Sequence, residues 1–209
     1  DRFHIGSQTK TFTGTVVLKY VDSGIVSLDD TLQDWFVSQP TVTSALSVMP
    51  QSLRETITVR NLLSMRTGLA EYLGGPDPNN PGQTVLDVWN AKNGNYDLTR
   101  EQLLAASLAL PATMVPGDES TFEYSNANFM LAGIIAEAAS CEAGNCRDIG
   151  TLITDEVIVP LNLDNTLYPT GTEWGTQQHT NGTWNYYGVL SDFTETTPSV
   201  PNSAGAMIS

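Results

Sequence analysis

The sequence predicts an α+β protein that is mainly helical, with little of its sheet within these residues. Three observations favour this fold class. Several segments place apolar residues at helical spacing, and the segment from Asn126 to Ala139 is apolar on nearly every side. Only the stretch from residue 166 to 209, rich in Thr, Gly, Trp and Tyr, suggests a strand or two. A complete α/β enzyme would show more strands, so we expect most of the sheet to lie outside these residues.

The first element is a helix over residues 7–23. Apolar residues recur along it at helical spacing, and Gly24 supplies its C-terminal stop. These residues are Phe12, Val16, Val17, Tyr20 and Val21. Residues 27–30 then form a turn that opens a short helical piece towards Trp35.

Thr58 caps a second helix, which runs from Val59 to about Met65 and ends near Gly68. Residues 74–82 contain three glycines and three prolines and must form a loop. Thr99 and Gln102 form a capping-box pattern for a third helix, which continues through Leu108.

Pro116-Gly117 makes a turn, and a short extended piece leads from it to residues 122–124. The apolar segment from Asn126 then predicts a buried central helix. A last helix covers residues 147–158 and is closed by Pro160.

The composition excludes several classes of function. Twenty-three acidic residues against nine basic ones give a formal net charge of −14, which repels nucleic acid phosphates and anionic membranes. Forty per cent of residues are hydrophobic, enough for a core. The longest apolar run, Phe129 to Ala139, is too short for a transmembrane segment, and Asp1-Arg2-Phe3 does not begin a signal peptide.

Cys141 and Cys146 are close in sequence, with Gly and Asn between them, and we expect them to form a disulfide rather than remain free thiols. Asn181-Gly182-Thr183 is an N-glycosylation sequon, which makes Asn181 a candidate glycosylation site. Together these features favour a secreted or periplasmic protein.

Ser7 and Lys10 stand three residues apart at the start of the first helix, which places both side chains on one face. Serine is a weak nucleophile until a base takes its proton, and a buried neutral lysine can be that base. Free backbone N–H groups at the helix N-terminus can stabilise a developing oxyanion. A Ser-x-x-Lys pair by itself is more often a solvated surface pair, so the rest of the sequence must show whether this pair is catalytic.

That context runs along the whole chain. The segments are Phe3-His4-Ile5-Gly6-Ser7-Gln8-Thr9-Lys10, Ile57 to Leu69, Pro116-Gly117, Phe122-Glu123-Tyr124-Ser125-Asn126, Leu131-Ala132-Gly133, Pro160 to Leu163 and Ser203 to Met207. In this order they resemble the serine β-lactamase and D,D-peptidase family, which includes class C β-lactamases and penicillin-binding proteins. The resemblance implies that family's fold, mainly its helical region, and a serine hydrolase acting through an acyl-enzyme.

The resemblance also implies roles for four residues. Ser7 would form the acyl-enzyme, Lys10 would activate it, and Tyr124 of the Tyr-x-Asn motif would shuttle the proton. Asn126 would bind Lys10 and the substrate amide. Either Lys10 or Tyr124 can be the general base. Structural alternatives are a packed aromatic for Tyr124 and an N-cap for Asn126. No cofactor or metal is implied.

One part of the family pattern is missing. We find no Lys-Thr-Gly or His-x-Gly motif after the Ser-Ala-Gly segment. His179 comes before that segment, and Arg66-Thr67-Gly68 belongs to the earlier segment Ile57 to Leu69 of the family pattern. The chain therefore resembles an internal portion of a longer protein, a partial domain over residues 1–209. It would comprise the nucleophile helix 7–23, a helical region over about 28–165 and a loop-rich segment 166–209, completed by further residues.

Other interpretations are weaker or stay open. A phosphate-binding loop needs Gly before Lys10, where Thr9 stands. For a Ser-His-Asp triad the sequence offers only His4 and His179, and it contains no Gly-x-Ser-x-Gly elbow.

An acyltransferase and a non-catalytic binding or scaffold protein remain alternatives. The substrate is a small molecule or peptide, either an ester, an amide or a β-lactam. Loops 72–80 and 174–187 are candidates for selecting it, and the alternative is that their aromatic residues only pack the loops.

Overall fold

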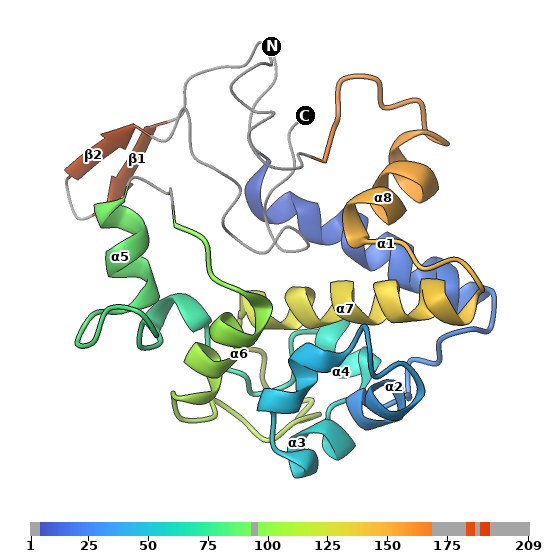
Figure 1. Ribbon diagram of the computed structural model, residues 1–209, viewed down its shortest axis with the longest axis horizontal. Coiled ribbons are helices and arrows are strands. Elements are labelled where there is room, and N and C mark those ends of the chain that lie inside the picture. The colour runs from blue at the N-terminus through green and yellow to red at the C-terminus, as the bar shows by residue number, and fades with distance from the viewer. Residues whose placement is uncertain (1–4, 93–95, 169–182, 187–188, 193–209) are drawn as a thin grey trace.

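The computed structural model describes residues 5–92, 96–168, 183–186 and 189–192. Helices dominate this part of the chain (Figure 1). The strands described are β1 (Thr183–Tyr186) and β2 (Val189–Asp192), which pair antiparallel with Thr183 opposite Asp192. The predicted fold class, a mainly helical portion of the β-lactamase and D,D-peptidase fold, is confirmed.

Helix α7 (Asn126–Glu142) is the centre of the molecule, and Figure 1 shows it crossing between the other helices. Every residue from Asn126 to Ser140 is buried. A helix that is apolar all round must be covered on all sides, which is the arrangement expected from its sequence. The helix runs three residues beyond the predicted Ala139.

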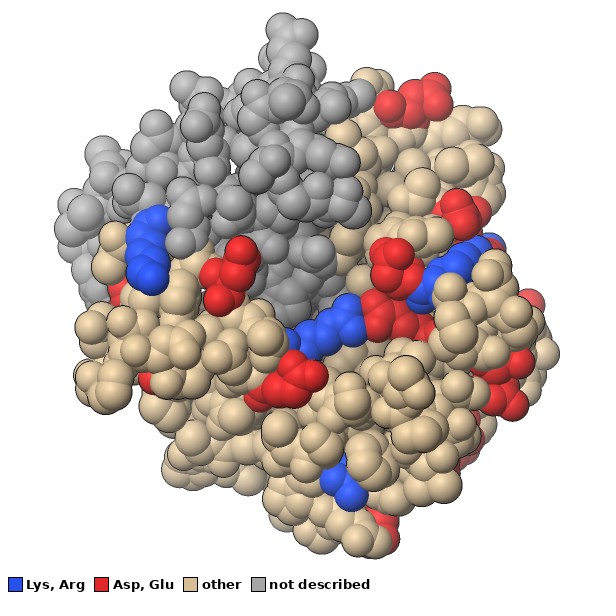
Figure 2. Space-filling model, viewed as in Figure 1, with Lys and Arg blue, Asp and Glu red and all other residues tan. Residues whose placement is uncertain are grey.

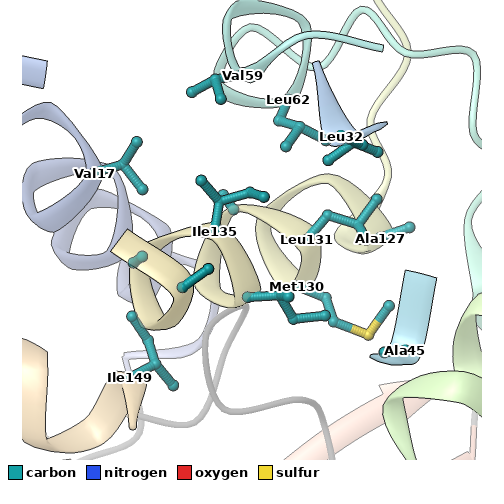
Figure 3. Close-up of a cluster of buried hydrophobic side chains, with 14 of the residues drawn as sticks. Val17, Leu32, Ala45, Val59, Leu62, Ala127, Met130, Leu131, Ile135 and Ile149 are labelled. Atoms are coloured by element: carbon teal, nitrogen blue, oxygen red, sulfur yellow. The ribbon is translucent and has the colours of Figure 1, made fainter. Parts of the chain in front are cut away.

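Apolar side chains from several helices meet around α7 (Figure 3). The partners include α1 (Thr9–Asp22), α2 (Leu32–Ser38), α4 (Val59–Leu63) and α8 (Ile149–Ile153). Fully or almost fully buried residues of this core are Val17, Leu32, Val59, Leu62, Met130, Leu131, Ile135 and Ile149. This cluster fixes how α1 lies against α7, and the site depends on that packing.

The predicted first helix is divided in two. A 3-10 turn, η1 (Gly6–Gln8), precedes α1, so Ser7 lies in the turn rather than in the α-helix itself. Gly6 has φ +52°, a left-handed conformation that glycine adopts without a steric penalty. The chain therefore turns sharply just before Ser7.

Capping boxes begin several of the following helices. Thr31 and Asp34 form one at α2, and Thr58 and Asn61 form another at α4. Between them lie η2 (Ser44–Val48) and α3 (Gln51–Thr56). The helix predicted to reach Met65 ends at Leu63 because the chain leaves the helical conformation, with Met65 at φ +53°.

The predicted loop over residues 74–82 follows η3 (Tyr72–Gly74) and contains no regular element. Asp77 organises it by accepting hydrogen bonds from the backbone N–H of Asn79 and the hydroxyl of Tyr96. Helix α5 (Val85–Ala91), which we did not predict, comes next. The helix predicted after Thr99 is α6 (Arg100–Leu108), and its capping box with Gln102 is present.

The last predicted helix, over residues 147–158, is also divided. Asp148 caps α8, so the helix begins at Ile149 rather than at the predicted residue 147. A π-helical turn, η4 (Thr154–Ile158), follows α8. Pro160 has no N–H to donate to the carbonyl of Glu156. Lys19 Nζ of α1 donates to that carbonyl instead, at 3.0 Å.

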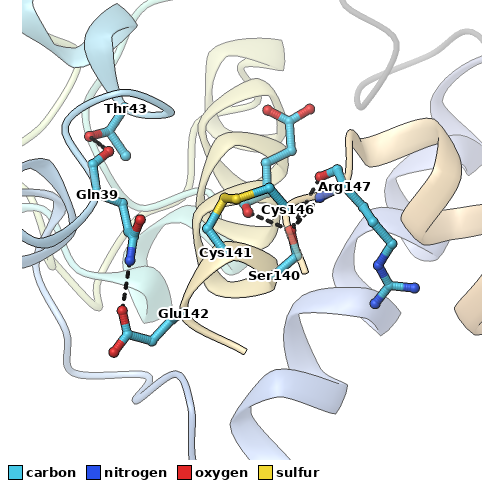
Figure 4. The surroundings of a disulfide bond; sticks show 8 residues. Gln39, Thr43, Ser140, Cys141, Glu142, Cys146 and Arg147 are labelled. Atoms are coloured by element: carbon cyan, nitrogen blue, oxygen red, sulfur yellow. Dashed lines mark hydrogen bonds between the residues drawn. A yellow bond between two sulfur atoms is a disulfide. The ribbon is translucent and has the colours of Figure 1, made fainter. Parts of the chain in front are cut away.

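Cys141 and Cys146 form the expected disulfide at the C-terminal end of α7 (Figure 4). Next to it, the N–H of Arg147 donates to Ser140 Oγ at 2.9 Å, and Gln39 Nε2 donates to Glu142 Oε2 at 2.7 Å. The disulfide and these bonds fix the turn that leads from α7 to α8.

Acidic side chains outnumber basic ones on the described surface in Figure 2, and several of the basic ones lie beside an acidic neighbour. Within the described residues, no helix combines the length and apolar character that crossing a membrane requires.

Candidate active site

Ser7 and Lys10 meet at the N-terminal end of α1. Lys10 Nζ donates a hydrogen bond to Ser7 Oγ at 3.0 Å. Ser7 is exposed, whereas Lys10 is only 6% exposed. The nucleophile candidate is thus open to a substrate, and its amine neighbour is shielded from solvent.

Tyr124 and Asn126 reach the same point from the start of α7. Tyr124 Oη lies 2.6 Å from Ser7 Oγ and also donates to Asn126 Oδ1 at 3.2 Å. Lys10 Nζ donates to the same Asn126 Oδ1 at 2.6 Å. All four residues that the sequence singled out therefore form one connected hydrogen-bond network.

Two helix N-termini converge at this network. Ser7 lies in the turn that begins α1, and Asn126 is the first residue of α7. The aligned peptide dipoles at such ends favour negative charge. At α7 the N–H groups of Asn126 and Ala127 are already bonded to Glu71 and Ser125, so this end contributes through its dipole. The position suits an oxyanion or a carboxylate that develops next to Ser7.

The turn after α4 supports α7 from beneath. Thr67 Oγ1 donates to Asn128 Oδ1 at 2.6 Å, and the N–H of Asn126 donates to Glu71 Oε2 at 2.7 Å. Gly68 has φ +75°, and a Cβ there would lie 2.1 Å from the carbonyl oxygen of Met114, so only glycine fits. Thr67 lies within the segment Ile57 to Leu69 that resembles the family and Glu71 lies just after it, but no sequence pattern indicated a role for either residue.

Tyr72 lies buried behind the network. Burial raises the pKa of its phenol well above the ordinary value, and the nearby carboxylate of Glu71 raises it further. Tyr72 is therefore neutral at physiological pH and brings no second negative charge to the site.

A cavity of about 580 Å³ opens beside the network, with Lys10 and Tyr124 in its wall. Apolar side chains form much of the rest, namely Leu18, Leu63, Met65, Phe122 and Phe129. A mainly apolar cavity with a few polar groups is typical of small-molecule sites.

The candidate glycosylation site Asn181 and the Ser203 to Met207 segment lie outside the described residues. So do His4 and His179, the two histidines considered for a Ser-His-Asp triad. In the part of the chain that the structure describes, no three His, Cys, Asp or Glu side chains form a cluster able to hold a metal ion.

Comparison with known proteins decides the family. The model of the Beta-lactamase family matches residues 1–206. The chain belongs to the β-lactamase family. Its match to Protein flp of Staphylococcus aureus (strain MW2) is 29% identical over 167 residues, covering 80% of this chain and 28% of that protein.

Two solved structures of β-lactamase-family fold are similar over nearly the whole chain. A D-stereospecific amidohydrolase from Streptomyces sp. has a TM-score of 0.78 at 28% identity, covering 100% of this chain and 57% of that one. A penicillin binding protein from Bacillus halodurans has a TM-score of 0.69 at 21% identity, covering 99% and 56%. The chain thus spans a little over half the length of these structures.

Proposed function

We propose that the whole protein is a serine hydrolase that acts through an acyl-enzyme on Ser7. One observation carries the proposal: Ser7 Oγ lies within hydrogen-bond distance of both Tyr124 Oη and Lys10 Nζ, at 2.6 and 3.0 Å. A nucleophile with an adjacent group that can take its proton is the arrangement that covalent catalysis requires, and Tyr124 and Lys10 are the two candidates for that group.

In the first step, Ser7 Oγ bonds to the carbonyl carbon of the substrate as its proton passes to Tyr124 or Lys10. The bond to the amine or alcohol then breaks, and the same proton leaves with that group. Water attacks the resulting ester in the second step and regenerates the Ser7 hydroxyl. Asn126 holds Lys10 in place throughout, because its Oδ1 accepts the 2.6 Å hydrogen bond.

For the substrate class, we propose small amides or esters, with amides of D-residues first among them. Support comes from the similar Streptomyces protein, which is a D-stereospecific amidohydrolase and is 28% identical to this chain where the two align. The apolar cavity beside Lys10 would accept the hydrophobic part of such a substrate. β-Lactams are a further candidate substrate within the same chemistry.

The test uses the whole protein, a fluorophosphonate probe and nitrophenyl acetate. We expect a mass shift on Ser7, and we expect Ser7→Ala to lose both labelling and at least about 1,000-fold in ester turnover. Folded Ser7→Ala protein with undiminished turnover would exclude this mechanism. A panel of D-aminoacyl amides, their L-isomers and a β-lactam then identifies the substrate.

Two alternatives give different results in these assays. A non-catalytic scaffold protein would leave the probe unreacted. An acyltransferase would label Ser7 but pass the acyl group to an added alcohol or amine in preference to water, which product analysis detects.

We also propose that the protein works in an oxidising compartment outside the cytosol. The disulfide between Cys141 and Cys146 supports this proposal, because such bonds persist where thiols are not kept reduced. Fractionation of the source cells, followed by detection of the protein, tests it.

A further inference from the structure

Glu71 contacts the start of α7 with both oxygens of its carboxylate occupied. Its Oε2 accepts the 2.7 Å hydrogen bond from the N–H of Asn126, and its Oε1 accepts from the N–H of Leu73 at 3.2 Å. The carboxylate thus joins the turn after α4 to the residue that holds Lys10.

We infer that Glu71 is a positioning residue for the acyl-transfer site, acting through the backbone of Asn126. The inference rests on the proposed function of Ser7 and Lys10. Glu71 touches neither Ser7 nor Lys10 in the hydrogen bonds of the described residues, so its role is to fix geometry rather than to transfer a proton.

An anion is well suited to this place. Asn126 is the first residue of a 17-residue helix, where the backbone N–H has no partner within the helix. The cap residue Ser125 accepts from the N–H of Ala127, which leaves the N–H of Asn126 to Glu71. A carboxylate there gains from both the charged hydrogen bond and the helix dipole.

The position of Asn126 matters because one atom serves two groups. Its Oδ1 accepts from Lys10 Nζ at 2.6 Å and from Tyr124 Oη at 3.2 Å. A small shift of the Asn126 backbone would therefore disturb both candidates for the general base. Displacements of about 1 Å in such sites can lower the rate by roughly 100-fold.

The turn itself has other supports. The carbonyl oxygen of Ala70 accepts from Ser125 Oγ at 3.1 Å and from Ser107 Oγ of α6 at 2.6 Å. Removing the Glu71 side chain should leave these bonds in place, so the effect on activity can be separated from an effect on folding. Ser107→Ala is the matched control, because it weakens the same turn without touching Asn126.

The experiment measures kcat and KM for nitrophenyl acetate and the melting temperature of Glu71→Ala, Glu71→Gln and Ser107→Ala in the whole protein. For Glu71→Ala we expect kcat/KM to fall about 10- to 100-fold, mainly through kcat. Glu71→Gln should recover to within about threefold of the wild type, because its amide oxygen can still accept from Asn126. Ser107→Ala should lower the melting temperature while kcat/KM changes by less than about twofold.

Equal kinetics in folded Glu71→Ala and wild type would overturn the inference, as would a loss that Glu71→Gln does not recover. If Glu71→Ala does not fold, the comparison of Glu71→Gln with Ser107→Ala decides, and a drop beyond threefold in Glu71→Gln contradicts the role. Ser7→Ala run in parallel separates the two proposals. Turnover that survives Ser7→Ala defeats the proposed function, whereas loss there with unaffected Glu71 variants defeats only the positioning role.

Discussion

Lys10 and Asn126 are 116 residues apart in sequence and are joined by a 2.6 Å hydrogen bond from Nζ to Oδ1. Both side chains are buried, each less than a tenth exposed. The bond therefore crosses the packed interface between α1 and α7, and it orients the amine of Lys10 towards Ser7. Any change in how these two helices pack will reach the candidate active site.

Replacing Asn126 by alanine should impair catalysis more than folding. The change removes the acceptor of a hydrogen bond from Lys10, and bonds to charged or basic groups are worth about 1.5–3 kcal/mol. We expect kcat/KM for an ester substrate to fall about 10- to 100-fold.

Asn128→Ala is the matched control for that variant. Asn128 lies on the same helix and is also buried, but it binds Thr67 and the carbonyl of Ser125 rather than Lys10. Its replacement should lower the melting temperature and leave the acylation rate of folded protein almost unchanged. Equal losses of kcat/KM in the two variants would mean that Asn126 has only a structural role.

Tyr124→Phe should separate chemistry from stability even more clearly. Tyr124 is 41% exposed, so the loss of its hydroxyl should change the free energy of unfolding by less than about 0.5 kcal/mol. The hydroxyl also lies 2.6 Å from Ser7 Oγ, and loss of a proton-transfer group lowers rates by about 100- to 10,000-fold. Steady-state kinetics and thermal unfolding on one preparation test both statements. Undiminished kcat in the variant would assign the proton transfer to Lys10.

Much of this arrangement could be predicted from the sequence. Ser7 and Lys10 are three residues apart in helical geometry, which puts both side chains on one face and brings them into contact. The Tyr-x-Asn motif places Tyr124 and Asn126 at the start of a helix whose apolar sequence demands burial. That these two residues meet Ser7 and Lys10 was implied by the family resemblance, because no local rule connects residues 116 positions apart.

Other features depend on tertiary contacts that no local pattern reveals. The carboxylate of Glu71 gains its role only when the turn after α4 folds beneath α7. Near the end of the helix predicted over residues 147–158, Lys19 of α1 donates to the carbonyl of Glu156, which Pro160 cannot reach with an N–H of its own. Glu137 likewise looks like an isolated acid in an apolar helix until Arg100 is placed beside it.

The pair formed by Arg100 and Glu137 should be a main contributor to the integrity of α7. Arg100 donates to both oxygens of the Glu137 carboxylate, which also accepts from the N–H of Ile149. Hydrogen bonding to Glu137 raises the pKa of Arg100, so the guanidinium stays charged. Arg100→Met would leave a buried carboxylate without its cation and should destabilise the protein by about 3 kcal/mol in urea unfolding.

The double variant Arg100→Met/Glu137→Met tests the cause of that loss. Replacing a buried ion pair by apolar residues is often neutral, so the second change should restore much of the stability lost in the first. A double variant that is less stable than Arg100→Met would show that the packing of these side chains, rather than the unpaired charge, dominates.

The ion pair between α1 and η4 should make stability depend on acid pH. Lys19 Nζ lies 2.6 Å from Glu156 Oε2, and Arg147 lies 3.0 Å from Glu156 Oε1. The hydrogen bond from Lys19 lowers the pKa of Glu156, and the contact with Arg147 lowers it further, while partial burial acts in the opposite direction. Because the folded-state pKa is the lower one, the stabilisation is complete above the unfolded value of about 4.3 and disappears as pH falls through the folded value.

Glu156→Gln removes this titration and keeps the side-chain shape. We expect the wild type to have a higher melting temperature than the variant at pH 7, and we expect the difference to shrink steadily between about pH 5 and pH 3. Thermal unfolding of both proteins across this range, at low and at high salt, measures it, and high salt should reduce the difference at pH 7 because the pair is partly exposed. A difference that stays constant with pH would mean that the carboxylate gains nothing from its charge, and that the carbonyl of Glu156 alone connects Lys19 to η4.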